Sequence, residues 1–119
     1  MNSKKKGSAG ERELLDILRR HGIEAARNDQ MYVGGAGLPD ILATIAGREW
    51  HIEAKRCESL RLNEWLEQAY HDAAKTPQRI PVVIFRRSRQ KWHVAISLDN
   101  LFSLLGISAE EGGNDAETP

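Results

Sequence analysis

Residues 38–56, which read LPDILATIAGREWHIEAKR, decide the fold that this sequence predicts. Two runs rich in apolar and β-branched residues, 38–45 and 49–56, lie on either side of Ala46-Gly47-Arg48. Strand-like runs separated by a short glycine-containing segment are typical of a β-hairpin. The stretch therefore predicts two neighbouring antiparallel strands joined by a tight turn.

The second strand of this hairpin carries two opposite charges within an apolar pattern. Residues two apart on a strand share a face, so Glu53 and Lys55 project together. Ile52 and Ala54 point to the opposite side. A Glu-x-Lys pair by itself is most often an exposed ion pair on a solvated sheet surface, where it contributes little to stability.

Asp40 gives that pair a chemical interpretation. It opens the first strand directly after Pro39, and closing the hairpin brings its carboxylate near that of Glu53. Two carboxylates forced together repel unless they share a proton or a cation. Mg²⁺ prefers hard oxygen ligands, and Mn²⁺ substitutes for it, so the pair predicts a divalent metal site. Lys55 is then the cation that orients the attacking water or stabilises charge on the phosphate.

The segment before the hairpin predicts a helix over residues 8–21, ended by Gly22. Its apolar stripe consists of Leu14, Leu15 and Leu18. Glu11 precedes these leucines by three, four and seven residues, so its carboxylate points toward the same face. A glutamate in the first turn also stabilises the helix dipole, which is an alternative reason for its presence.

The rest of the chain predicts further regular elements. They are a strand over 23–27, a glycine-containing loop over 28–38, a helix over 62–75, strands over 80–86 and 91–97, and a helix over 99–105. The order α-β-β-β-α-β-β-α predicts an α+β (mixed α/β) domain, with helices flanking a central mixed sheet. We expect a flexible basic arm over 1–7, one domain over 8–106 and a disordered acidic tail over 107–119.

Composition excludes several classes of protein. The 119 residues contain one cysteine, Cys57, and four histidines without zinc-ligand spacing, which excludes a disulfide framework and a Cys-rich zinc site. No apolar run approaches the roughly 20 residues that cross a bilayer, and no secretory signal is found, so we expect a cytoplasmic protein without a membrane partner. Without the four acidic residues of 109–119, the chain has 17 basic and 13 acidic residues. This modest excess of positive charge is compatible with DNA binding.

Four short motifs, in order, resemble those of the PD-(D/E)XK nucleases, and most closely the archaeal-type Holliday junction resolvases and related phage nucleases. Those proteins begin with Gly-x-x-Glu-Arg-Glu-Leu, and residues 7–15 read GSAGERELL. An arginine then closes their first strand and a variable polar loop leads to an Asp, which correspond to Arg27, residues 28–38 and Asp40. Their Ile-Glu-x-Lys strand corresponds to residues 52–55. The resemblance extends over about residues 7–98.

This resemblance implies a restriction-endonuclease-like core and a Mg²⁺-dependent, structure-selective DNA endonuclease of the Holliday junction resolvase type. It implies that the carboxylates of Asp40 and Glu53 and the carbonyl of Ala54 bind metal. Lys55 would lie at the scissile phosphate. Glu11 would bind a second metal ion or a metal-bound water.

The same resemblance implies residues that contact DNA. Arg12 and Arg27 match positions where the family places phosphate-binding arginines, although surface arginines also serve solubility alone. Many members place a catalytic glutamine on the helix after the lysine strand, which corresponds to Gln68. Their tyrosine four residues later is missing, since Tyr70 follows after two, and a surface glutamine is the alternative. The basic arm with Lys4, Lys5 and Lys6 either binds DNA or is a solvated terminus.

Other functions fit the same residues. A flap, single-strand or restriction-type nuclease would use the same site, and a catalytically silent DNA-binding module would keep the fold. The intact set of acids and lysine favours an enzyme. Two coordinated cuts at a branched DNA need two sites, so we expect a homodimer. Its candidate contact surfaces are the C-terminal strand and the 99–105 helix, whose apolar residues alternatively cap the core of the monomer: Leu101, Phe102, Leu104 and Leu105.

The remaining aromatic and titratable residues are predicted to be structural. Trp65, Phe85 and Trp92 belong in the core rather than in base-stacking platforms, because aromatic side chains dominate protein cores. His51 and Cys57 have no partner that the sequence identifies, so both are interpreted as structural or incidental.

Overall fold

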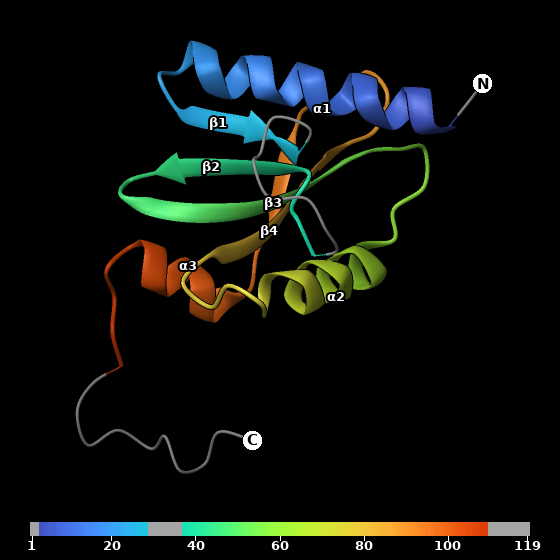
Figure 1. Ribbon diagram of the computed structural model, residues 1–119. Coiled ribbons are helices and arrows are strands. Elements are labelled where there is room, and N and C mark those ends of the chain that lie inside the picture. The colour runs from blue at the N-terminus through green and yellow to red at the C-terminus, as the bar shows by residue number, and fades with distance from the viewer. Residues whose placement is uncertain (1–2, 29–36, 110–119) are drawn as a thin grey trace.

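The fold is built on one five-stranded sheet, shown in the computed structural model of Figure 1. The structure describes residues 3–28 and 37–109. The strands are β1 (Glu24–Arg27), β2 (Ile41–Ile45), β3 (Arg48–Arg56), β4 (Ile80–Arg86) and β5 (His93–Ala95). The helices are α1 (Ser3–Arg20), α2 (Leu62–Ala73) and α3 (Leu98–Leu104). This is the element order that the sequence predicts.

The strands lie in the sheet in chain order. β1, β2 and β3 are antiparallel neighbours, and the predicted hairpin is present, with Ile41 opposite Ile52 and Ile45 opposite Arg48. β4 runs parallel to β3 and antiparallel to β5. Parallel neighbours need a crossover connection, and α2 supplies it between β3 and β4. The mixed sheet of an α+β domain is therefore confirmed.

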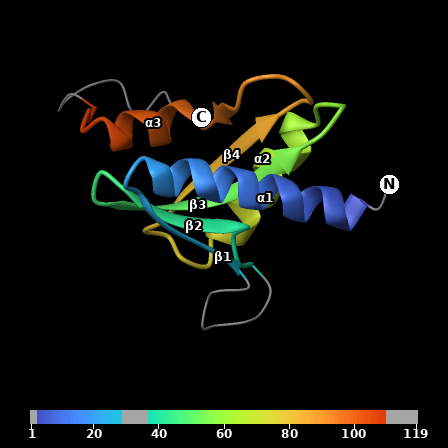
Figure 2. The same cartoon turned by 90° about the horizontal axis from the view of Figure 1, so that it is seen from above.

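α1 covers one face of the sheet and α2 the other, which gives three layers (Figure 1 and Figure 2). The α1 face is filled by the predicted and now buried leucine stripe: Leu14, Leu15 and Leu18. Ile52 and Ala54 of β3 are buried against these leucines. Gly10 allows α1 to approach the sheet, because a Cβ at this position would lie 2.9 Å from the Cβ of Arg56.

The α2 face has a smaller core of its own. Trp65 and Ala69 of α2 are buried against Val83 of β4, and Phe85 packs beside them. The ring centroids of Trp65 and Phe85 are 6.1 Å apart. Trp92 is partly buried against the α1-face core. Trp65 is therefore a core residue, as predicted, whereas Phe85 and Trp92 are partly buried against the two core clusters.

β3 lies between the two layers and carries polar side chains on its α2 face. Alternation along the strand places His51, Glu53 and Lys55 on this face, opposite to Ile52 and Ala54. The predicted shared face of Glu53 and Lys55 is thus confirmed. His51 and Glu53 are only 1% and 2% exposed. Buried titratable groups need partners, so this face is where a site is expected.

In the first half of the chain, the starts of α1 and β2 differ most from the predicted boundaries. α1 begins at Ser3 rather than at residue 8, so residues 3–7, expected as a flexible arm, continue the helix. Lysine is a good helix former, and the three lysines favour this extension. β2 begins at Ile41 rather than at residue 38. Pro39 has no N–H for a strand ladder, and Gly37 turns the chain with a φ of 85°.

In the second half of the chain, α2 and β5 are shorter than predicted. α2 ends at Ala73 rather than at residue 75, and β5 covers three residues, His93–Ala95, instead of seven. The chain before β5 is still completing its turn, since Arg89 has a φ of 63° and Gln90 bonds back to Arg87. Residues 29–36 of the predicted loop and 110–119 of the predicted tail lie outside the described residues.

α3 is the last helix of the described residues and lies near the start of β3, where Arg48 Nη1 donates to Ser103 Oγ at 3.2 Å. Its first turn is capped by Ser97, whose Oγ accepts the N–H of Asn100 at 3.1 Å. Leu104 packs against the α1-face core. Leu101 and Phe102 are 38% and 40% exposed, so α3 caps the monomer with part of its apolar surface only. Within residues 3–28 and 37–109, the helices are too short or too polar to span a bilayer.

Candidate active site

Asp40 and β3 meet where β2 begins. Asp40 directly precedes β2, so its register continues the Ile41–Ile52 pair and places it opposite Glu53. The Asp40 Oδ2 accepts a hydrogen bond of 2.9 Å from the backbone N–H of Ala54. This bond fixes the carboxylate against the strand that carries Glu53 and Lys55, as the hairpin predicted.

Several of the predicted site residues line one groove beside this junction. It has a volume of about 500 Å³ and runs along the C-terminal end of β3. Its walls include four predicted residues, Glu11, Asp40, Ala54 and Lys55, together with Arg56, Arg61 and Trp65. Glu53 lies behind this surface, almost fully buried. The fold therefore brings together residues that are 44 positions apart in the chain, from Glu11 to Lys55.

The electrostatic state of Asp40 distinguishes this groove. Burial raises the pKa of the Asp40 carboxyl to about 7, and the negative charges of Glu53 and Glu11 act in the same direction. The hydrogen bond from Ala54 and the charge of Lys55 act against this rise, but they only partly offset it. The positive charge near Asp40 is thus too small to offset its burial and the repulsion from the neighbouring acids.

Glu11 is tied to one of the predicted arginines. Arg27 donates from Nη2 and Nε to Glu11 Oε1 at 3.1 and 3.3 Å, and both side chains are largely buried. Arg12 is exposed on α1. Gln68 is exposed on α2 and is not among the residues that line the groove. Lys4, Lys5 and Lys6 belong to the first turns of α1, and their side chains lie outside what the structure describes.

His51 is a residue whose partner the sequence did not reveal. Its Nε2 lies 3.0 Å from Glu53 Oε1, in the buried layer under α2. Asp72 of α2 approaches the same place, and the possible ligand atoms of His51, Glu53 and Asp72 all lie within 4.8 Å of one another. Among the described residues, His51, Glu53 and Asp72 are the three possible metal ligands whose atoms lie this close together. The carboxylates of the predicted set, Glu11, Asp40 and Glu53, lie farther apart.

Two sequence patterns could have identified these neighbours. His51 precedes Glu53 by two residues on a strand, so the two side chains share a face. Asp72 follows Trp65 by seven and Ala69 by three residues, which places it on the buried stripe of α2. His51, interpreted from the sequence as structural or incidental, thus has a buried partner in Glu53 on the same face of β3.

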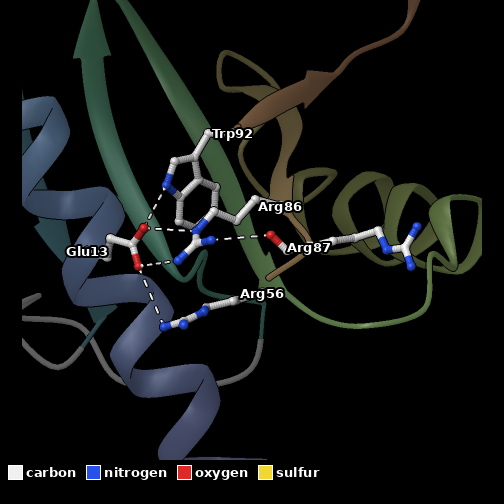
Figure 3. A network of polar contacts seen from close by, with 5 residues as sticks. All are labelled: Glu13, Arg56, Arg86, Arg87 and Trp92. Atoms are coloured by element: carbon white, nitrogen blue, oxygen red, sulfur yellow. Dashed lines mark hydrogen bonds and ion pairs between the residues drawn. The ribbon is translucent and has the colours of Figure 1, made fainter. Parts of the chain in front are cut away.

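A second acidic centre lies on the α1 side of the same strand end (Figure 3). Glu13 accepts hydrogen bonds from Arg86 Nη2 and from Trp92 Nε1, both at 3.1 Å. Arg86 Nε lies 2.9 Å from the carboxylate as an ion pair, and Arg56 Nη1 lies 3.6 Å away. The hydrogen bond from Arg86 is the main reason why the pKa of Glu13 is lowered. This network joins α1 to the ends of β3 and β4.

Comparisons with known proteins agree with this fold. The family model described as "Phage putative PDDEXK endonuclease" matches residues 2–111 of the chain. No curated protein matches. Among solved structures, the Holliday junction resolvase Hjc of the archaeal hyperthermophile Archaeoglobus fulgidus is similar, with a TM-score of 0.58 and 26% sequence identity over 76% of each chain. This likeness confirms the restriction-endonuclease-like fold that the motifs implied.

Proposed function

The chain belongs to the phage PDDEXK endonuclease family, and from this premise we propose that it is a Mg²⁺-dependent endonuclease that cuts branched DNA. The observation that carries the proposal is the Asp40 carboxyl, whose pKa is raised to about 7 on the wall of an open groove. Strongly perturbed acids in clefts are typical of functional sites. A divalent cation would remove the repulsion that Asp40 experiences from Glu53.

The residues around Asp40 fit such a cation. Asp40, Glu53 and the Ala54 carbonyl would hold it, with Glu11 on the same groove for a second ion. A strand residue directs its N–H and its C=O to the same side. Since the Ala54 N–H points to Asp40, and β2 pairs with β3 only up to Ile41, the carbonyl is directed toward the same junction. This donor set consists of hard oxygens, which suits Mg²⁺ or Mn²⁺.

Lys55 supplies the positive charge of the site itself. A bound Mg²⁺ would contribute Lewis-acid activation of the phosphodiester and of water. Lys55 lines the groove beside Asp40, and its charge lowers the pKa of that carboxyl. Positioned there, the ammonium group stabilises the negative charge that develops on the phosphoryl oxygens as the bond breaks.

Cations around the groove would bind the DNA backbone on either side of the cut. Arg56 and Arg61 belong to the groove wall. Arg12 is exposed one residue after Glu11, and Arg27 is anchored by its bonds to Glu11 close to the site. The first turns of α1, with its three lysines, would extend this contact along the DNA. Such contacts bind phosphates and do not read base sequence.

The branched substrate is proposed from the likeness to the archaeal resolvase. Resolving a four-way junction takes two coordinated cuts, which a homodimer with two-fold symmetry would provide. Leu98, Leu101, Phe102 and Leu105 leave apolar surface exposed on and beside α3, and this surface is our candidate for the contact. Shape rather than sequence would select the DNA.

A cleavage panel tests the activity. The full chain is incubated with a four-way junction, a flap, a duplex and a single strand, each with Mg²⁺, Mn²⁺, Ca²⁺ or EDTA. We expect cleavage with Mg²⁺ or Mn²⁺ only, and tighter DNA binding with Ca²⁺, because the ion offsets the repulsion between the acids and a phosphate. Metal-indifferent binding without cleavage of any substrate would instead indicate a silent DNA-binding module.

Competition tests the substrate separately from the activity. Labelled junction is bound and then challenged with excess unlabelled junction, duplex, flap or single strand at a salt concentration that weakens nonspecific contacts. We expect only the junction to compete strongly. Removal of residues 1–6 should weaken binding of junction and duplex by similar factors, whereas Arg27→Ala should mainly lower cleavage. Equal competition by duplex or flap would reject junction selectivity and leave the nuclease activity standing.

A further inference from the structure

Glu53 has neighbours on the side away from the groove that the proposed chemistry does not use. His51 Nε2 lies 3.0 Å from Glu53 Oε1, and the two side chains are 1% and 3% exposed. A carboxylate oxygen accepts hydrogen bonds, and an imidazole with its proton on Nε2 donates one, so this contact fits a hydrogen bond from His51 to Glu53 Oε1. Such a bond would occupy one oxygen of Glu53.

Packing on both sides keeps this pair in place. His51 lies on the same face of β3 as Glu53, and β3 is paired with β2 and with β4 at this point of the sheet. α2 covers the pair, held by the packing of Trp65 and Ala69 against Val83. Because the pair is enclosed, few other donors are available to Glu53 Oε1, and the loss of the imidazole would leave a buried oxygen unsatisfied.

We propose that His51 is a positioning residue that fixes the Glu53 carboxylate through Oε1, so that Oε2 would be the oxygen left to bind the metal ion. This inference rests on the proposed function, in which Glu53 is a metal ligand. Partners of this kind set the orientation of a ligating side chain, and their loss typically costs about 10–100-fold in metal affinity.

The alternative use of the same atoms is a metal site made of His51, Glu53 and Asp72, whose possible ligand atoms lie within 4.8 Å of one another. The two interpretations differ in the proton of the ring. A protonated Nε2 donates to Glu53 and has no lone pair for a metal, whereas a ligating His51 would present an unprotonated nitrogen to the ion. In our proposal Asp72 of α2 lies beside the pair and does not bind metal, whereas in the alternative it is a ligand. A substitution of Asp72 therefore distinguishes the two interpretations.

Mn²⁺ binding measured from the electron paramagnetic resonance signal of free Mn²⁺ tests the proposal without reference to cleavage. The variants are His51→Leu, His51→Gln and Asp72→Asn, each checked for folding by circular dichroism. His71→Leu is the matched control, because His71 is an exposed histidine on α2. We expect His51→Leu to weaken Mn²⁺ binding about 10–100-fold. His51→Gln should recover most of the affinity, since an amide N–H also donates, and Asp72→Asn and His71→Leu should bind almost as the wild type does.

Each other outcome is decisive. Unchanged Mn²⁺ affinity in His51→Leu would overturn the positioning role. A loss in Asp72→Asn as large as that in His51→Leu would also overturn it and would indicate the three-residue metal site. If the wild-type chain itself bound no Mn²⁺, the proposed metal-dependent function would fail, and the inference with it, which is a distinct result from the first two.

A measurement on the wild-type chain covers the case in which His51→Leu does not fold. Long-range ¹H–¹⁵N spectra of histidine rings identify which nitrogen carries the proton. We expect a protonated Nε2 on His51 without metal, and the same state after addition of Mg²⁺, because the ion would bind the other oxygen of Glu53. An unprotonated Nε2, or one that loses its proton when Mg²⁺ is added, contradicts the proposal.

Discussion

Two acidic centres lie beside the same end of β3, and the pKa values of their carboxyl groups are shifted in opposite directions. Glu13, on the α1 face, accepts hydrogen bonds from Arg86 and Trp92, and its pKa is lowered, mainly by Arg86 (Figure 3). Asp40, at the groove, has its pKa raised to about 7 by burial and by Glu53. Glu13 is thus stabilised by two hydrogen-bond donors and a second arginine. Among the described residues, Asp40 accepts a hydrogen bond from the Ala54 N–H and is stabilised by the charge of Lys55.

We interpret this difference as that between a structural acid and an acid of the proposed metal site. Surrounding donors stabilise the charged form of Glu13, and this stabilises the attachment of α1 to the sheet. At Asp40 the chain retains an arrangement that destabilises the charged form. Such an arrangement is retained for function when an external cation completes it. Each prediction below changes one of the two centres.

The largest effect is expected when an acid of the groove is neutralised. Asp40→Asn or Glu53→Gln should lower Mg²⁺-dependent cleavage at least about 100-fold, because Lewis-acid activation contributes several kcal/mol to the transition state. The fold should persist, as judged by circular dichroism. Single-turnover cleavage of the best substrate of the panel provides the measurement. Turnover like that of the wild type in either variant would reject the metal-site assignment.

Lys55→Ala is expected to have the next largest effect. Its charge is needed most in the transition state, so kcat should fall about 100–1,000-fold while DNA affinity changes little. Lys91→Ala, which removes an exposed lysine from the β4–β5 connection, serves as the matched control. If binding collapsed in Lys55→Ala and bound DNA were still cut at the normal rate, Lys55 would be a phosphate anchor only.

The raised pKa of Asp40 predicts a pH dependence of the metal-free chain. The unfolded chain loses this proton near pH 3.8 and the folded chain near pH 7, so the free energy of unfolding should fall as the pH rises between these values. The full effect is a few kcal/mol at most, at roughly 1.4 kcal/mol per pKa unit. Asp40→Asn should remove most of this fall, and Mg²⁺ should restore stability at high pH.

Thermal unfolding from pH 5 to pH 8, with and without Mg²⁺, checks this dependence. Glu67→Gln is the control, since Glu67 is an exposed acid on α2 outside both centres. A wild-type chain as stable at pH 8 as at pH 5 in EDTA would show that Asp40 is not held in a destabilised state.

The smallest effect is expected at the satisfied centre. Glu13→Gln keeps the shape of the side chain but removes the charge that two arginines share, and should cost about 1 kcal/mol because the carboxylate is one-third exposed. Since the pKa of Glu13 is lowered by the fold, this contribution is present at neutral pH and disappears as the pH falls through that lowered pKa. Cleavage by the folded variant should be unchanged, measured below its melting temperature.

The fold was predictable where local pattern and packing agree. The leucine stripe of α1, the turn at Ala46-Gly47 and the apolar run of β4 have one reasonable conformation each, and all are found. The boundaries were less predictable, because they depend on pairing. β2 begins at Ile41 only because Pro39 and Gly37 keep the preceding residues out of the ladder, and α1 begins at Ser3 because nothing in the basic segment ends the helix.

Sequence reasoning identified four residues that line the groove, Glu11, Asp40, Ala54 and Lys55, but few of their contacts. The alternation along 51–55 and the hairpin spacing were enough to associate Asp40 with Glu53 and Lys55. Some contacts join segments that are far apart in the chain. Arg27 of β1 bonds to Glu11 of α1, and Asp72 of α2 approaches His51 and Glu53 of β3. A periodic pattern places each side chain on a face of its own element, but only the packing of the elements shows which faces meet.

The sequence by itself determined the element order, the shared face of Glu53 and Lys55, and the position of Asp40 opposite Glu53 in the hairpin. These follow from periodicity and turn chemistry, which are properties of short segments. Only the tertiary structure decided the charge state of each acid. Glu13 and Asp40 are both acidic residues beside β3, but burial and the donors within 4 Å set their pKa values in opposite directions, and those donors are assembled only when α1 and the sheet pack together.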